Sequence, residues 1–373
     1  MKQIEYSGYG SLNKLASILK KHKPKHIFLA TGNKSFERSG ADITLNKILS
    51  GYKFVRYSGF EENPRLENVQ EAIGVLVKDD YDFVVAVGGG SIIDSAKIAN
   101  SLSSQSGKPL DYIVGKRKIS KRGRIFVAIP TTAGSGSEAT HFTVVYVNGI
   151  KYSLADSSIL PNYSISDSKL TMSLPKKVTA SSGMDALAQA VESFWCINST
   201  IQSKSYSRKA IKLIVKNLEN AVNAPNKSNR IAIMTGSHLV GKAINITKTT
   251  APHAISYPLT MRYGISHGHA VGLTLGKIFA YNSGVTDKDV TDKRGAKYVR
   301  NSISELCTLL GVKDAKQAED KINSLMSKIG LETNMGQLGI KPSEELLNEI
   351  NSERLVNNPR LITKQDVIGF LND

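Results

Sequence analysis

Asp185, His253 and His267, in the second half of the sequence, have the residue types of ligands for a divalent metal ion. Asp185 and Gln189 lie four residues apart in a stretch with a helical pattern, so both would project from one helix face. His253 and His267 follow in a segment that holds three of the seven histidines. One carboxylate and two imidazole groups are a common ligand set for a divalent metal such as Fe²⁺ or Zn²⁺. The spacing also allows simpler roles, with Asp185 as a carboxylate at a helix N-terminus and Gln189 as a hydrogen-bonded core amide.

Two glycine-rich loops in the first half are suited to phosphate binding. Gly88–Ser91 follows an apolar strand and opens a helix, where backbone amide groups at a positive helix end can bind a phosphate. A second loop at residues 130–138 follows another strand and carries hydroxyls and glycines, at the strand end where open α/β sheets bind ligands. The glycine spacing in both loops differs from G-x-G-x-x-G, the ordinary Rossmann fingerprint. We expect the nucleotide to be contacted by Gly88, Gly89, Gly90, Ser91, Asp94, Lys97, Thr131, Thr132, Ser135 and Ser137.

Alternating strands and helices must position these loops. Short apolar runs predict strands at residues 26–30, 53–57, 82–87 and 124–129. Helices are predicted at residues 66–77 and 92–102. A nearly all-apolar strand is typical of a parallel sheet that is covered by helices on both faces. We therefore expect an α/β dinucleotide-binding domain with a parallel sheet at residues 1–173.

The pattern changes after this domain to one of helices only. The predicted helices lie at residues 182–195, 203–221, 229–246, 299–310, 314–329 and 343–351. The connecting segments are short, and no run matches the strands of the first half. We expect an all-helical domain that binds metal and substrate at residues 174–373.

The charge balance limits the classes of partner. The 373 residues include 49 Lys+Arg and 32 Asp+Glu, for a net charge of +17, which fits nucleic acid binding, small anionic ligands or a lysine-rich surface. The basic run at residues 116–124 has no aromatic residue that could stack on bases, so we expect no nucleic acid partner. No apolar run reaches about 18 residues, so we expect no membrane partner. The start of the chain does not resemble a signal peptide, and Cys196 and Cys307 lack metal-type spacing, so we expect a cytoplasmic protein.

Longer blocks around these motifs resemble the iron-dependent (group III) alcohol dehydrogenases over nearly the whole chain. The matching blocks lie at residues 88–97, 130–140, 182–195 and 253–273. The resemblance implies a nucleotide-binding α/β domain followed by a helical domain, the dehydroquinate synthase-like fold. It also implies hydride transfer between NADPH or NADH and an aldehyde, with Fe²⁺ as the expected metal and Zn²⁺ as the alternative. A homodimer is expected.

The resemblance assigns the metal ligands to Asp185, Gln189, His253 and His267. Family members usually have a histidine in place of Gln189, and an amide oxygen is a weaker ligand than imidazole for Fe²⁺ or Zn²⁺. Tyr257 stands where many relatives have a histidine that relays protons. A phenol has an unperturbed pKa near 10, so it is a poorer base at neutral pH. We expect Tyr257 and His267 to be the catalytic residues.

Segments at residues 151–175, 241–276 and 284–295 resemble the phosphonoacetaldehyde reductase branch of the family. We therefore expect reduction of phosphonoacetaldehyde to 2-hydroxyethylphosphonate in phosphonate biosynthesis. A dianionic head group requires cations and hydroxyls, and the expected substrate ligands are Lys242, Lys248, Thr250 and Arg262. Surface charges at helix ends would explain the same pattern.

Three alternative functions remain open at this stage. Another alcohol or polyol dehydrogenase, or a dehydroquinate synthase-like lyase, would use the same ligand set. In a different class, an inactive basic protein could bind nucleic acid.

The cofactor preference depends on the residues after the first predicted strand. NAD-preferring relatives often place an aspartate there, which repels the 2′-phosphate of NADPH. This sequence has Gly32 at that position, followed by Asn33 and Lys34. Because the repulsion is absent and a cation is close, we expect these three residues to contact the cofactor and NADPH to be preferred to NADH.

Overall fold

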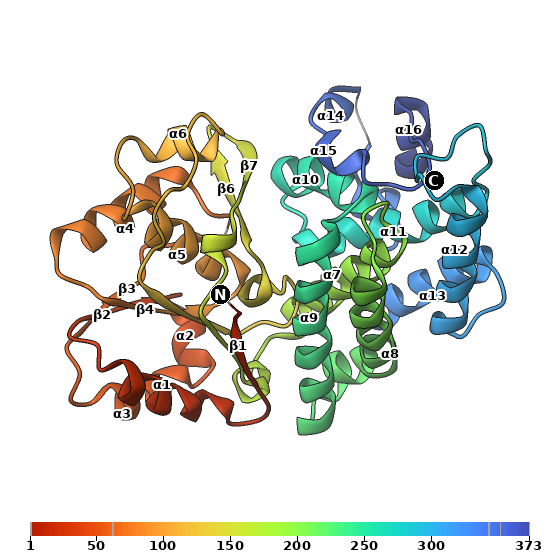
Figure 1. Cartoon of the computed structure of the whole chain (residues 1–373). Helices are drawn as coiled ribbons and strands as arrows, with labels where there is room; N and C mark the ends of the chain where they lie inside the picture. The colour runs from red at the N-terminus through yellow and green to blue at the C-terminus, as the bar shows by residue number, and fades with distance from the viewer. Residues whose placement is uncertain (1, 62, 342–343, 351, 373) are drawn as a thin grey trace. The chain divides into compact units, whose positions relative to one another are not determined.

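The computed structural model describes residues 2–61, 63–341, 344–350 and 352–372. The chain forms two compact units that divide after Leu174 (Figure 1). This division lies one residue beyond the predicted boundary between residues 173 and 174. Within the described residues, no helix is both long and apolar enough to cross a membrane.

The first unit contains a sheet of six strands, and every strand pair in it is parallel. The strand order is β1-β8-β5-β4-β2-β3. The strands are β1 (Ile4–Ser7), β2 (Ile27–Thr31), β3 (Phe54–Tyr57), β4 (Phe83–Gly88), β5 (Ile125–Pro130) and β8 (Tyr163–Ser166). This confirms the predicted parallel sheet, and β2, β3, β4 and β5 agree with the four predicted strands to within one residue at each end. The two strands β1 and β8 were not predicted.

Helices cover both faces of this sheet. Successive side chains of a strand point to opposite faces, so Phe28 and Val84 lie in one apolar core while Leu29 and Val85 lie in the other. One core is covered by α4 (Leu66–Lys78), α5 (Gly90–Leu102) and α6 (Pro109–Ile113) (Figure 1). The other is covered by α1 (Lys14–His22), α2 (Lys34–Arg38) and α3 (Ala41–Leu49).

A separate hairpin in the first unit was not predicted. Strands β6 (Phe142–Val147) and β7 (Ile150–Ala155) pair antiparallel. Asn148 and Gly149 connect them, and both have positive φ angles, of 50° and 78°. An Asn-Gly pair between two apolar runs is a strong hairpin signal, because both residues tolerate this conformation. The signal was therefore present in the sequence.

The second unit is helical. Its helices are α7 (Lys176–Trp195), α8 (Ile201–Asn223), α9 (Lys227–Thr247), α10 (Ala251–Tyr263), α11 (His267–Ser283), α12 (Ala296–Leu310), α13 (Ala315–Lys328), α14 (Glu344–Asn348), α15 (Ser352–Leu355) and α16 (Lys364–Asn372). The helix predicted at residues 343–351 lies partly outside the described residues, and its described part includes α14. Neither α10 nor α11 was predicted.

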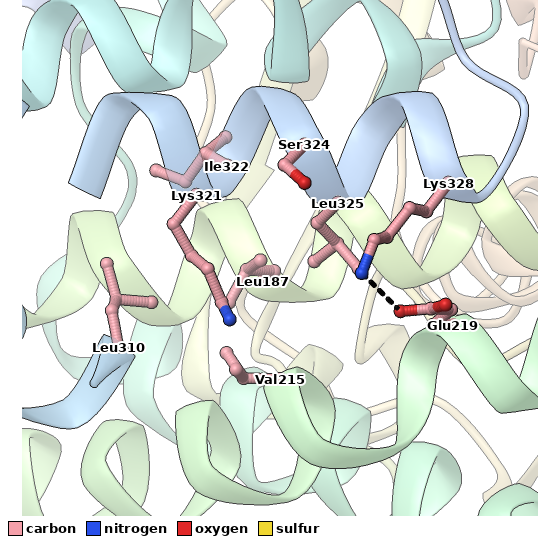
Figure 2. A pocket seen from close by; sticks show the side chains of 9 residues that line it. All are labelled: Leu187, Val215, Glu219, Leu310, Lys321, Ile322, Ser324, Leu325 and Lys328. Atoms are coloured by element: carbon pink, nitrogen blue, oxygen red, sulfur yellow. Dashed lines mark hydrogen bonds and ion pairs between the residues drawn. The ribbon is translucent and has the colours of Figure 1, made fainter. Parts of the chain in front are cut away.

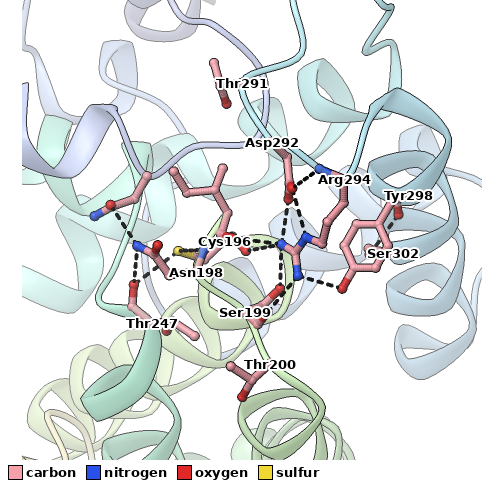
Figure 3. A network of polar contacts seen from close by, with 12 residues as sticks. Cys196, Asn198, Ser199, Thr200, Thr247, Thr291, Asp292, Arg294, Tyr298 and Ser302 are labelled. Atoms are coloured by element: carbon pink, nitrogen blue, oxygen red, sulfur yellow. Dashed lines mark hydrogen bonds and ion pairs between the residues drawn. The ribbon is translucent and has the colours of Figure 1, made fainter.

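Helix α7 is the central element of this unit and packs against α8, α9, α11 and α12. It begins six residues earlier than predicted, so Asp185 lies in the middle of the helix and not at its N-terminus. Arg294 holds the chain just after α7, where the last carbonyls of a helix need donors. Its guanidinium donates to the carbonyl oxygens of Cys196 at 3.1 Å and Ser199 at 2.7 Å, and it pairs with the buried carboxylate of Asp292 (Figure 3).

Candidate active site

Three helices of the second unit bring Asp185, His253 and His267 together. Asp185 comes from α7, His253 from the first turn of α10, and His267 is the first residue of α11. One possible ligand atom from each residue lies within 4.8 Å of the others. Asp185 and His253 are buried, and His267 is half-buried. The cluster has the residue types of a divalent metal site.

A glycine permits the close approach of α11 to α7. A Cβ atom on Gly268 would overlap the carbonyl oxygen of Ser181 and would lie 2.8 Å from Cβ of Asp185. The residue next to His267 must therefore lack a side chain, because α11 otherwise could not reach the helix turn that carries Asp185. The sequence shows the glycine, but only the packing shows its purpose.

Gln189 lies one helical turn after Asp185, and its side chain is consistent with a fourth ligand. The residue is buried, and its Oε1 atom has no hydrogen-bond partner among the residues that the structure describes. Its amide group forms a hydrogen bond with Asp185. A buried amide oxygen without a partner is costly, and a bound cation would satisfy it. The side chains of the cluster therefore fit a divalent metal, with Gln189 as the expected fourth ligand.

The charges in the cluster favour an anionic Asp185 beside a protonated His253 when no metal is bound. Although burial alone lowers the pKa of His253, the carboxylates of Glu192 and Asp185 raise it to about 9. Burial raises the pKa of Asp185, but hydrogen bonding and the two histidines outweigh this and lower it. His253 Nε2 lies 3.2 Å from Asp185 Oδ1. A metal at this point must therefore displace a proton from the imidazole.

Tyr257 lies beside the cluster, as expected for a residue that acts there. Its ring stacks on that of His267, with centroids 5.8 Å apart and an interplanar angle of 21°. Burial raises the pKa of Tyr257, so the phenol stays protonated at neutral pH and is a hydrogen-bond donor rather than a base. It also hydrogen-bonds with Thr249 and Arg354.

Arg354 is a candidate functional residue that the sequence analysis missed. It lies on α15, is only 8% exposed, and contacts Tyr257, which lies nearly a hundred residues earlier in the chain. No sequence pattern connects it with the histidine segment. A buried guanidinium beside the cluster can bind an anionic group of a substrate.

Two of the four residues predicted to bind the substrate anion, Arg262 and Thr250, have partners within the protein. Arg262 is bound by Glu349 at 2.6 Å and by Glu345 at 3.1 Å, so carboxylates already occupy its donors. The Thr250 hydroxyl is buried and contacts Glu192 and Trp195. These contacts argue against both residues as substrate ligands.

The two predicted lysine ligands lie in α9 and directly after its last residue. Lys242 Nζ lies 5.1 Å from the centroid of the Tyr206 ring. Lys248 is exposed, just beyond the helix end. Their role in anion binding stays a prediction.

His269 does not belong to the cluster, although it lies only two residues after His267. Its ring is buried, and Nε2 lies 2.9 Å from the carbonyl oxygen of Glu332. A spacing of two residues on a helix directs side chains to different faces. His269 thus serves as a matched control for His267.

In the first unit, the two glycine-rich loops lie next to each other at the carboxyl ends of the paired strands β4 and β5. Gly88 ends β4 and Gly90 begins α5, a helix of 13 residues. A Cβ atom on Gly90 would lie 2.6 Å from Oγ of Ser135, in the loop after β5. The backbone at the start of α5 is therefore positioned to bind a phosphate, as expected for Gly88, Gly89, Gly90 and Ser91.

Three of the predicted nucleotide contacts have protein partners that support this loop. Asp94, Lys97 and Ser137 are all buried. The hydroxyl of Ser137 donates to Asp94 Oδ1, and Lys97 Nζ donates to the carbonyl oxygens of Ser137 at 2.9 Å and Phe142 at 2.8 Å. The polar atoms of these side chains thus bind the loop after β5 and the start of β6, and their contact with the nucleotide stays a prediction. Thr131, Thr132 and Ser135 lie in that loop and stay predicted contacts.

Gly32, Asn33 and Lys34 follow β2, which lies between β4 and β3 in the sheet. Asn33 and Lys34 are exposed there. Arg56 of β3 reaches the same edge, where its guanidinium donates to Thr31 Oγ1 at 2.9 Å and to the carbonyl oxygen of Gly32 at 3.2 Å. The sequence analysis missed Arg56 as a second cation, because its position next to Gly32 follows from the pairing of β2 with β3.

A pocket elsewhere in the second unit lacks the chemistry of the cluster. It lies between α7, α8 and α13, with Leu187, Ile322 and Leu325 among its lining (Figure 2). The one carboxylate that lines it, Glu219, pairs with Lys328 at 3.4 Å. The candidate chemistry therefore belongs to the cluster around His253.

Comparisons with known proteins identify the family of the chain. The family model described as iron-containing alcohol dehydrogenase matches residues 4–168, and its C-terminal counterpart matches residues 179–373. Long-chain-alcohol dehydrogenase 1 of Geobacillus thermodenitrificans is 30% identical, over 91% of this chain and 86% of that protein. Phosphonoacetaldehyde reductase of Streptomyces viridochromogenes is 32% identical, over 78% of this chain and 76% of that protein.

The solved structures show the same relationship. Sulfoacetaldehyde reductase of Bifidobacterium kashiwanohense, in complex with NAD⁺, has a TM-score of 0.89 and 30% identity. The match covers 100% of this chain and 98% of that chain. With family matches in both units, we conclude that the chain is an NAD(P)-dependent, metal-dependent oxidoreductase that belongs to the iron-containing alcohol dehydrogenase family.

Proposed function

We propose that the protein reduces a small anionic aldehyde to its alcohol with NADPH, at a divalent metal held by Asp185, Gln189, His253 and His267. The observation that carries this proposal is the cluster of Asp185, His253 and His267, whose ligand atoms lie within 4.8 Å of one another. Fe²⁺ is the expected metal and Zn²⁺ the alternative. Hydride from the nicotinamide adds to the carbonyl carbon, and a proton adds to the oxygen.

The residues around the cluster have separate roles in this reaction. When bound, the metal supplies Lewis-acid polarisation of the carbonyl oxygen. Tyr257, stacked on His267, keeps its phenol proton and can donate a hydrogen bond to the reacting oxygen. Burial of Asp185 and His253 excludes water, which strengthens electrostatic interactions at this point.

The substrate class is proposed from Arg354 and from two relatives. One relative is named for phosphonoacetaldehyde and one structural neighbour for sulfoacetaldehyde, and both compounds join an aldehyde to an anionic head group. Arg354 is the buried cation beside Tyr257, and a guanidinium can bind either head group through two hydrogen bonds. Phosphonoacetaldehyde, and hence a role in phosphonate biosynthesis, is the substrate that we favour.

The test is NADPH oxidation with three aldehydes: phosphonoacetaldehyde, sulfoacetaldehyde and neutral propanal. The enzyme is reconstituted with Fe²⁺ or Zn²⁺, and the metal content of the same sample is measured. We expect kcat/KM for the preferred anionic aldehyde to exceed that for propanal at least about 10-fold, because charged hydrogen bonds contribute roughly 1.5–3 kcal/mol. Equal values for all three aldehydes would refute the anionic substrate class but would leave the reductase chemistry standing.

The preference for NADPH is proposed from the edge of β2 and β3. Gly32 provides no carboxylate against a 2′-phosphate, and Lys34 and Arg56 bring two cations to this edge. Glu37 lies 3.9 Å from Arg56 and would compete with the phosphate in part. We expect Arg56→Gln to weaken NADPH binding about 10-fold and to leave NADH binding unchanged. Lys47→Gln, on the exposed side of α3, is the control. Tighter binding of NADH than of NADPH by the wild type would overturn the preference.

A further inference from the structure

Glu192 lies on α7, two turns after Asp185, and is completely buried. Its Oε1 atom accepts hydrogen bonds from the backbone nitrogen of Thr250 at 2.9 Å and from the Thr250 hydroxyl at 3.1 Å. It also accepts from the backbone nitrogen of His253 at 3.3 Å. Thr250 is the N-cap of α10, so a carboxylate from a different helix satisfies the free amide groups at the start of α10. The positive end of the helix dipole stabilises its charge.

The other oxygen of Glu192 contacts the imidazole of His253. Oε2 bonds to His253 Nδ1, while Nε2 on the opposite side of the ring lies 3.2 Å from Asp185 Oδ1. An ionised carboxylate can only accept hydrogen bonds, so Nδ1 must carry a hydrogen. The lone pair of a neutral His253 is then confined to Nε2, which faces the other proposed ligands.

We propose that Glu192 is a positioning residue for the metal, because it fixes both the tautomer and the direction of His253. This inference rests on the proposed ligand set. One carboxylate thereby serves two purposes: Oε1 orders the first turn of α10, and Oε2 orients the imidazole that the same turn carries. Hydrogen bonds from ligand histidines to carboxylates typically change metal affinity 10- to 100-fold.

The variant Glu192→Gln separates these two purposes. A glutamine has nearly the same shape, and its amide oxygen can still accept from Thr250 and from the backbone of His253. Its NH₂ group would then face His253 Nδ1, which must become the acceptor. The hydrogen moves to Nε2, and that nitrogen can no longer bind a metal without a further rearrangement.

The experiment measures Co²⁺ and Zn²⁺ binding by chelator competition, with the visible absorption of the Co²⁺ protein as a spectroscopic readout. We expect Glu192→Gln to lower the affinity at least 10-fold and to alter the Co²⁺ spectrum. The melting temperature in EDTA should stay within a few degrees of the wild type, because the contacts to the start of α10 remain. These readouts do not depend on catalytic activity or on knowing the substrate.

Asp292→Asn is the matched control, because Asp292 is also a buried carboxylate of the second unit that is replaced by an amide of the same shape (Figure 3). It pairs with Arg294 after α7 and does not contact the cluster. We expect a lower melting temperature and an unchanged metal affinity. Wild-type affinity in Glu192→Gln would overturn the positioning role and leave Glu192 as a helix cap only. If the wild type itself bound neither metal, the proposed ligand set would fail instead.

Discussion

The phosphate-binding loops of the first unit and the ligand cluster of the second differ in which part of the chain would meet the ligand. At the ends of β4 and β5, backbone amides would bind the nucleotide, and the buried side chains of Asp94 and Lys97 hold the loop in place. In the cluster, the side chains of Asp185 and His253 are the candidate ligands, and Gly268 lets the helices approach. A buried carboxylate is therefore structural support in one site and a candidate ligand in the other, and its neighbours decide which.

This comparison predicts that the cluster is the more sensitive site to the loss of one side chain. Replacement of His267 by Ala removes a proposed ligand and should lower kcat/KM by more than about 100-fold, with a matching loss of bound metal. His269→Ala removes an imidazole from the same helix turn but should keep its metal and most of its activity. Steady-state kinetics and metal analysis of both variants test this, and equal losses would show that the cluster is not the reaction centre.

The next largest effect is expected at Arg354, with Arg262 as its control. Arg354→Gln should raise KM for an anionic aldehyde roughly 30-fold and leave KM for propanal nearly unchanged, because only the anion loses a charged hydrogen bond. Arg262→Gln should change neither value, since its guanidinium is already bound to Glu345 and Glu349. The reverse result would restore Arg262 as the substrate ligand.

The backbone site should respond to added atoms rather than to removed ones. Gly90→Ala should weaken NADPH binding about 10-fold, because its Cβ would lie 2.6 Å from Ser135 Oγ and force the loops apart. Ser135→Gly removes one predicted hydroxyl contact and should weaken binding less than Gly90→Ala, since the backbone amides remain. The double variant Gly90→Ala with Ser135→Gly should recover most of the affinity, as measured by NADPH fluorescence. No recovery would mean that the loops do not depend on this close approach.

The smallest effect concerns the support beneath the loops. Burial lowers the pKa of Lys97 to about 8, although Asp94 partly opposes this. Between pH 8 and the unfolded value near 10.5, the unfolded chain binds more protons, so stability should rise with pH. Lys97→Met removes the titrating amine. The unfolding free energy of the wild type should therefore rise by on the order of 2 kcal/mol more than that of Lys97→Met over this pH range. Parallel pH profiles for the two proteins would contradict the shifted pKa.

The first unit was predicted well because its signals are local. Apolar runs and adjacent glycines define β4, its loop and the start of α5 within about 20 residues of one another. Side-chain partners across the sheet were less predictable. His26 lies among lysines in the sequence, yet it is buried and stacks on Tyr81. The hydrogen bonds of Asp94 and Lys97 to the neighbouring segment were not visible in the motif, because burial is not a property of a motif.

The sequence by itself determined the parallel sheet, the glycine loops and the residue types of the ligand set, because periodicity and adjacency are properties of neighbouring positions. The tertiary structure alone decided which side chains meet. Asp185 and His253 are 68 residues apart in the sequence and meet in the cluster. Arg354, although Arg262 is nearer in the sequence, is the arginine that contacts Tyr257. Glu192 contacts the imidazole of His253. Each of these contacts depends on how whole helices pack. That packing follows from the sum of apolar contacts along α7, α10, α11 and α15, not from any one motif.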